Sequence, residues 1–124
     1  MIVDGDAHAR ELARAFLAGV GHSVTLAADG AEALARLADA HPDVILTEIM
    51  LRKIDGLSLC KRVKGDPATE HIKVVVFSIM AALVRSHEAG ADEFLKKPLT
   101  QRKLVDVVAS VLGTPAAPLT REES

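Results

Sequence analysis

The feature that most constrains the fold is a short apolar run that carries one acid at its downstream end. Residues 43–47 read Asp-Val-Ile-Leu-Thr without polar alternation, and Glu48 follows them. Such a run is typical of a strand that is buried on both faces, as in a parallel sheet. Ligands of open parallel sheets bind just beyond the carboxyl ends of the strands. Glu48 is therefore predicted to stand at the functional edge of the sheet.

Strand-like and helix-like patterns alternate along the chain. Connections of this length require right-handed crossovers between parallel strands. The alternation therefore predicts a flavodoxin-like (βα)5 fold of the α/β class, a five-stranded parallel sheet in the order 2-1-3-4-5 with helices on both faces. The predicted strands cover residues 1–3, 23–27, 43–47, 72–77 and 92–95, and the predicted helices cover residues 7–18, 31–40, 56–64, 81–89 and 100–112.

The length and composition fit one globular domain. The chain has 124 residues, of which 49% are hydrophobic and 26% charged, enough apolar material for one core and too little length for two domains. After residue 113 the sequence shifts to proline, alanine and charged residues. This predicts a folded domain over residues 1–113 and a linker or disordered tail over residues 114–124.

Charge and cysteine content exclude several functional classes. A formal net charge of −2 gives no electrostatic basis for nucleic-acid binding. No apolar run approaches the length of a membrane span, and Asp4 and Asp6 argue against a signal peptide. Cys60 is the only cysteine, so no internal disulfide can form. These features predict a cytoplasmic domain that contacts neither membrane nor nucleic acid.

Several motifs recur in a fixed order. They are Ile2-Val3-Asp4 and the stretches 28–34, 42–46, 49–51, 55–57, 74–78 and 90–99. In their joint order and spacing they resemble the receiver domain of response regulators in two-component (phosphorelay) systems, over residues 1–113. The resemblance implies transfer of a phosphoryl group from a histidine kinase to an aspartate, with Mg²⁺ bound beside it.

The half of the site that accepts the phosphoryl group departs from the family pattern at two positions. Asp4 matches the first acidic position, but Gly5 occupies the second, which usually supplies a direct metal ligand. Glu48 occupies the position of the acceptor aspartate. Met50 matches the residue whose backbone carbonyl binds the metal. The resemblance is therefore to an atypical receiver with a degenerate phosphoacceptor site.

The half that senses the phosphoryl group is retained. Ser78 matches the hydroxyl that binds a phosphoryl oxygen, Lys97 matches the site lysine, and Phe94 matches the aromatic switch position. We expect Glu48 to form a salt bridge with Lys97, and Lys97-Pro98 to be a cis peptide. Ser78, Phe94 and Lys97 form the predicted switch.

Metal binding is expected to be weak or absent. Mg²⁺ requires hard oxygen ligands in near-octahedral geometry, and Gly5 offers no side-chain oxygen. The remaining candidate ligands are Asp4, Asp6 and Glu48. Asp6 also suits the N-cap of the first helix, because aspartate is favoured there.

The sequence leaves three functional hypotheses open, two of them non-enzymatic. Glu48 can imitate a phosphorylated aspartate and keep the domain constitutively active, or the domain can be a protein-interaction module that does not depend on phosphorylation. In both, no catalytic residue and no cofactor are expected. The partner face is predicted over residues 82–112, the fourth helix, fifth strand and fifth helix, with a histidine kinase, a fused output domain or a second copy as partner. The enzymatic alternative is a haloacid-dehalogenase-like phosphatase that uses Asp4 and Asp6.

Overall fold

The computed structural model describes residues 1–79 and 83–114, and it confirms the alternation of strands and helices. In the described part of the chain, no helix is both long and apolar enough to cross a membrane. The elements in chain order are β1 (Ile2–Val3), α1 (Ala7–Ala18), β2 (Leu26–Ala27), α2 (Gly30–Ala40), β3 (Val44–Glu48), α3 (Gly56–Lys64), β4 (Lys73–Ser78), α4 (Leu83–Glu88), β5 (Glu93–Lys96) and α5 (Gln101–Leu112).

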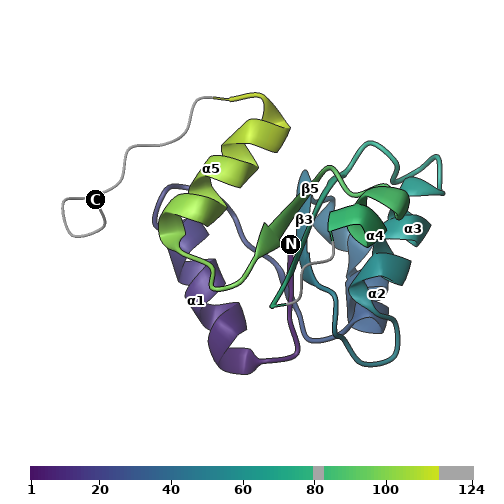
Figure 1. Ribbon diagram of the computed structural model, residues 1–124, viewed down its shortest axis with the longest axis horizontal. Coiled ribbons are helices and arrows are strands. Elements are labelled where there is room, and N and C mark those ends of the chain that lie inside the picture. The colour runs from purple at the N-terminus through teal and green to yellow at the C-terminus, as the bar shows by residue number, and fades with distance from the viewer. Residues whose placement is uncertain (80–82, 115–124) are drawn as a thin grey trace.

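The five strands form one parallel sheet in the order β2-β1-β3-β4-β5, which confirms the predicted flavodoxin-like topology. Figure 1 shows α1 and α5 on one side of this sheet and α2, α3 and α4 on the other. The central strands β3 and β4 are covered on both faces. This is why their sequences lack polar alternation.

Each face of the sheet has its own apolar core. On one face, Val74 and Val76 of β4 pack with buried residues of α2 and α3. On the other face, Val75 and Phe77 pack with buried residues of α1 and α5. Successive side chains of β4 therefore pack in alternate cores, because the side chains of a strand point alternately to its two faces.

All five strands differ from their predicted bounds by one or more residues, and the differences in β3 and β2 have consequences for the site and the sheet. β3 extends to Glu48, which pairs in register with Phe77, so the acid is the last residue of the strand. β2 is limited to Leu26–Ala27 instead of residues 23–27. The reason is that β1, the strand it pairs with, offers only two residues for the ladder.

The predicted fourth helix over residues 81–89 is observed as α4, with residues 81 and 82 outside the described part of the chain. Within the predicted linker, Thr114 is described and residues 115–124 lie outside the described residues.

Helix starts are fixed by aspartates at the carboxyl edge of the sheet. Asp6, Asp29 and Asp55 are the N-caps of α1, α2 and α3, and each accepts hydrogen bonds from backbone N–H groups of its helix. The predicted N-cap role of Asp6 is thus confirmed. At the start of α3, a Cβ on Gly56 would lie 2.0 Å from the Glu48 carbonyl oxygen. Only glycine therefore lets this helix approach the end of β3 so closely.

Candidate functional site

A cleft of about 970 Å³ opens at the carboxyl ends of β1 and β3. Five of the six predicted site residues line it, namely Asp4, Gly5, Glu48, Met50 and Lys97. They come from the ends of β1 and β3 and from the segment after β5. The cleft is thus formed where parallel strands of this topology present their ligand sites.

Glu48 is buried, and both oxygens of its carboxylate have polar partners. Its Oε2 lies 2.7 Å from Lys97 Nζ, which confirms the predicted salt bridge. Its Oε1 accepts hydrogen bonds from the backbone N–H groups of Ile49 at 3.0 Å and Met50 at 3.4 Å. The acid is therefore held in one orientation by the lysine and by its own loop.

Asp4 shares the same lysine. Its Oδ2 lies 3.4 Å from Lys97 Nζ, and its Oδ1 accepts from the backbone N–H of Asp6 at 2.9 Å. Burial alone would lower the pKa of Lys97, but the hydrogen bond to Glu48 and the charge of Asp4 outweigh it and raise that pKa. One ammonium thus lies between two buried carboxylates, and the three groups together carry a formal charge of −1.

The lysine is aimed at the cleft by its surroundings. Lys97 follows β5 directly, and the Lys97-Pro98 bond is cis, as predicted. Its Nζ also lies 5.2 Å from the centre of the Phe77 ring. The ammonium therefore has an aromatic neighbour in addition to its two carboxylates.

Comparison with known proteins identifies the family. The chain matches the family described as "Response regulator receiver domain" over residues 1–109. This chain belongs to the response-regulator receiver family. The receiver is 32% identical to Protein PilG of Pseudomonas aeruginosa over 111 residues, which cover 87% of the chain and 82% of PilG.

Two further relatives support the assignment. Response regulator MprA of Mycobacterium tuberculosis is 32% identical over 115 residues, covering 90% of this chain and 49% of MprA. The chain thus spans about half the length of that relative. A crystal structure of a putative response regulator from Chloroflexus aurantiacus superimposes with a TM-score of 0.86 at 35% identity, covering 90% of this chain and 94% of the other.

The two remaining predicted switch residues, Ser78 and Phe94, are not among the residues that line the cleft. Ser78 is completely buried as the last residue of β4. Phe94 pairs in register with Val76 and is partly buried against the core shared with α2 and α3. Phe94 therefore faces the side of the sheet on which α4 lies.

The two residues that follow Asp4 differ in their roles. The Asp6 side chain accepts from the backbone N–H groups of His8 and Ala9, so it is committed to α1. A Cβ on Gly5 would meet only the Ala28 carbonyl oxygen, at an ordinary 3.8 Å. The backbone at Gly5 thus has room for a side chain, and nothing in the fold requires glycine there.

Two arginines of the site carried no sequence signal. Arg10 of α1 donates from Nη1 to the Asp4 carbonyl oxygen at 2.7 Å and so ties the helix to the end of β1. Arg85 of α4 lines the cleft. Neither position belongs to the motifs of the resemblance, and each reaches the site only through the packing of its helix on the sheet.

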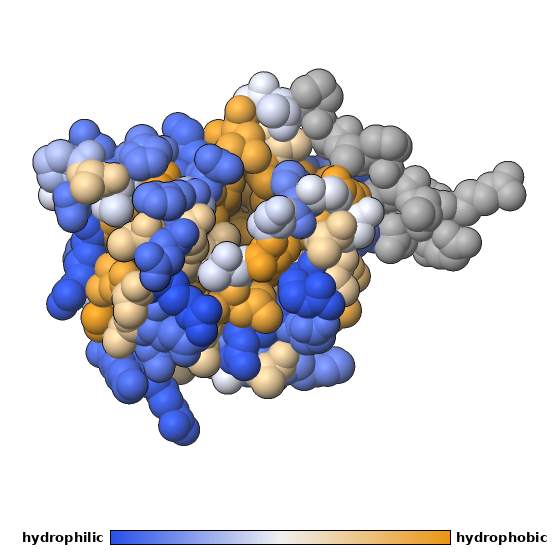
Figure 2. Space-filling model, turned by 180° about the vertical axis from the view of Figure 1, so that it is seen from behind, coloured by the Kyte–Doolittle hydropathy of each residue, from blue (hydrophilic) through white to orange (hydrophobic). Residues whose placement is uncertain are grey.

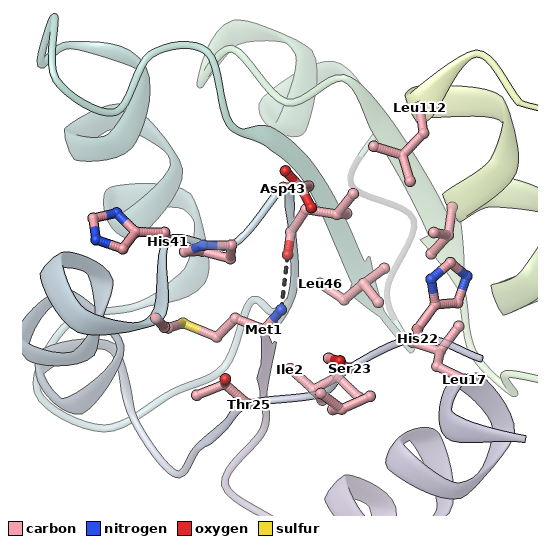
Figure 3. A pocket seen from close by; sticks show the side chains of 15 residues that line it. Met1, Ile2, Leu17, His22, Ser23, Thr25, His41, Asp43, Leu46 and Leu112 are labelled. Carbon is pink, nitrogen blue, oxygen red and sulfur yellow. Dashed lines mark hydrogen bonds between the residues drawn. The ribbon is translucent and has the colours of Figure 1, made fainter.

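A second hollow, of about 210 Å³, lies at the opposite edge of the sheet (Figure 3). His22, His41 and Asp43 are among its lining residues, and the Met1 amino nitrogen donates to the Val44 carbonyl oxygen at 2.8 Å beside it. It is bounded by the amino-terminal ends of β1 and β3. It therefore has no part in the cleft that holds Glu48 and Lys97.

Proposed function

We propose that this receiver domain works in signal transduction without phosphorylation at the usual position. In this role the chain is a protein-interaction module and not an enzyme. The observation that carries the proposal is the position of Lys97 Nζ, 2.7 Å from Glu48 and 3.4 Å from Asp4. The lysine that would neutralise an incoming phosphoryl group already has two carboxylate partners.

The chemistry of the acceptor also supports the proposal. A glutamate carries its nucleophilic oxygen one methylene further than an aspartate. Misplacement of reacting atoms by about 1 Å can reduce a rate on the order of a hundredfold. In addition, Glu48 is anchored by two backbone N–H groups and by Lys97, so moving it toward a donor would break these contacts.

The donor set does not fit Mg²⁺ well. Asp4 and Glu48 supply carboxylates and Met50 a carbonyl, but Gly5 supplies no side-chain oxygen and Asp6 is engaged with α1. Within residues 1–79 and 83–114, no three histidine, cysteine, aspartate or glutamate residues are grouped so as to hold a metal ion. We infer that Mg²⁺ binds here weakly or not at all, since it demands near-octahedral oxygen ligation.

Within this proposal, Glu48 is a constitutive mimic of a phosphorylated aspartate. Two features support it: the contact with Lys97 exists in the unmodified chain, and Phe94 packs against the core. The signalling face would then be α4, β5 and α5, which bind a protein partner such as a kinase, an output domain or a second copy. Glu48→Gln should leave the fold intact, release Phe94 outward and abolish partner binding.

The phosphatase alternative is not favoured. Its second aspartate would be Asp6, whose carboxylate caps α1, and the family assignment points to a signalling module.

The test is labelling with acetyl phosphate in the presence of Mg²⁺, followed by mass spectrometry. The wild-type domain should acquire no acyl phosphate. Gly5→Asp combined with Glu48→Asp should restore labelling, because the backbone at Gly5 has room for a side chain. The matched control is Gly5→Ala with Glu48→Asp, which supplies the acceptor without the metal ligand. Stable phosphate on Glu48 of the wild-type domain would overturn the proposal.

A further inference from the structure

A small hollow between α4 and β5, the α4–β5 hollow, is lined by a buried hydroxyl group that forms no hydrogen bond. Its volume is about 190 Å³, and its described lining residues are Ser86, His87, Ala91, Asp92, Glu93 and Phe94. Ser86 is 1% exposed, and its Oγ has no hydrogen-bond partner in the described part of the chain. A buried polar atom without a partner costs about 1–3 kcal/mol. Such an atom beside a hollow indicates a partner that comes from outside the chain.

The size and place of the hollow limit what it can hold. Pockets for drug-sized ligands measure about 300–1,000 Å³, so this hollow suits a single side chain or a water molecule instead of a cofactor. It lies on the α4 and β5 part of the face that is predicted to bind a protein partner. This position favours a side chain of that partner as the occupant.

The lining is acidic, and one of its two carboxylates is uncompensated. Asp92 belongs to the fold, because its Oδ2 accepts from Lys64 Nζ and from the Val74 backbone N–H, each at 2.8 Å. Glu93 is exposed and forms no ion pair in the described residues. No lysine or arginine is among the described lining residues. The hollow therefore favours a cationic group.

Phe94 adds an aromatic ring to the lining. A guanidinium stacks on aromatic rings and offers five N–H donors in a planar fork. An ammonium is a compact charge that is more strongly hydrated. A hydroxyl, a carboxylate and a ring around one small hollow therefore match a guanidinium better than an ammonium.

We propose that the α4–β5 hollow receives an arginine side chain of a partner protein. The guanidinium would donate to Ser86 Oγ and to the Glu93 carboxylate and stack on the Phe94 ring. This inference rests on the proposed role as an interaction module and deepens it. It names the side chain that the α4 and β5 part of the predicted face recognises.

Apolar exposure by itself does not identify such a position. Figure 2 shows apolar side chains coming to the surface in patches near the middle of the rear face, among many hydrophilic ones. Scattered apolar residues of this kind are normal on a folded domain. The α4–β5 hollow differs because a buried hydroxyl, an uncompensated carboxylate and an aromatic ring line the same small space.

The experiment compares two short peptides that differ at one position, where one has arginine and the other has citrulline, its uncharged analogue. Binding is followed by amide chemical shifts of the ¹⁵N-labelled full chain. The arginine peptide should shift the amide signals of Ser86, Glu93 and Phe94 and bind about tenfold more tightly than the citrulline peptide. A lysine peptide should have an affinity between the two.

Ser86→Ala separates a binding role from a structural one. Because Ser86 Oγ has no partner in the described residues, its removal should leave thermal stability unchanged or raise it, while the arginine peptide binds about tenfold more weakly. Glu93→Gln should also weaken binding and reduce its salt dependence. Glu88→Gln is the matched control, because it changes an exposed carboxylate of α4 that is not among the lining residues. It should leave peptide binding unchanged.

Equal affinity for the arginine and citrulline peptides, or unchanged affinity in Ser86→Ala, would overturn the proposal. So would a hollow that holds only an ordered water: Ser86→Ala would then lower thermal stability, and neither peptide would shift the signals of the lining residues. The titration uses no phosphodonor. Its failure would therefore leave the outcome of acetyl phosphate labelling, and with it the proposed function, unchanged.

Discussion

Two partly buried lysines of this receiver, Lys64 and Lys97, are paired with carboxylates at opposite edges of the sheet. At the amino-terminal edge, Lys64 Nζ lies 2.8 Å from Asp92 Oδ2 and donates to the Ile72 carbonyl oxygen at 2.7 Å. The same Asp92 oxygen accepts from the Val74 backbone N–H at 2.8 Å. At the carboxyl edge, the single Lys97 ammonium forms ion pairs with two carboxylates, those of Asp4 and Glu48.

The comparison distinguishes an ion pair that only stabilises the fold, at Lys64, from a candidate functional site, at Lys97. Around Lys64 the charges balance one to one, and the remaining groups belong to the backbone of β4 and the turn before it. Around Lys97 one negative charge remains in excess, and the group borders an open cleft. A surplus of charge that the fold itself does not need indicates a position kept for interaction or chemistry.

Removing the cation should have its largest effect at the carboxyl edge. Lys97→Met leaves Asp4 and Glu48 close together and buried without a counter-ion. We expect a loss of about 3 kcal/mol in the free energy of unfolding, as for other broken buried pairs. Lys64→Met is the matched control and should cost about 1–2 kcal/mol, because Asp92 keeps its backbone donor and is more exposed. Urea denaturation measures both, and equal losses would contradict the comparison.

A glycine packs against each lysine cluster, which gives a second, smaller comparison. A Cβ on Gly56 would lie 2.0 Å from the Glu48 carbonyl oxygen, so backbone must shift. A Cβ on Gly90 would meet the flexible Lys64 side chain at 3.3 Å, at a φ of +91°. Gly56→Ala should therefore cost about 2–3 kcal/mol and Gly90→Ala about 1 kcal/mol. Thermal unfolding should rank them in this order, with Gly5→Ala near zero, and a reversed order would be inconsistent with the close approach at Gly56.

The smallest expected effect is a pH dependence at the amino-terminal edge. Burial alone would raise the pKa of Asp92, but the hydrogen bonds from Lys64 and from the Val74 backbone N–H lower it. A lowered folded-state pKa contributes stability above the unfolded value, about 3.9, and that contribution is lost as the pH falls through the folded value. Asp92→Asn should thus destabilise the domain near neutral pH, and the difference from wild type should shrink below about pH 4. Denaturation at several pH values measures this, and a constant difference would exclude the linkage.

The sequence by itself determined the elements and the edge at which the site forms. Unalternating apolar runs identified β3 and β4 because both are covered on two faces. The acid at the end of β3 placed Glu48 at the carboxyl edge, and Asp6 signalled the start of α1. These features depend on neighbours in the chain, on side-chain period and on capping, so a local pattern can carry them.

Only the tertiary structure decided the full set of contacts between the side chains of the site. The pairing of Glu48 with Lys97 followed from the family resemblance, but the second contact of Lys97 with Asp4, 93 positions away, did not. No sequence motif indicated that Arg10 and Arg85 would lie at the site. Each depends on how a helix or a loop packs on the completed sheet, and no local period records such packing. The short β2 has the same cause, because the two residues of β1 limit its pairing.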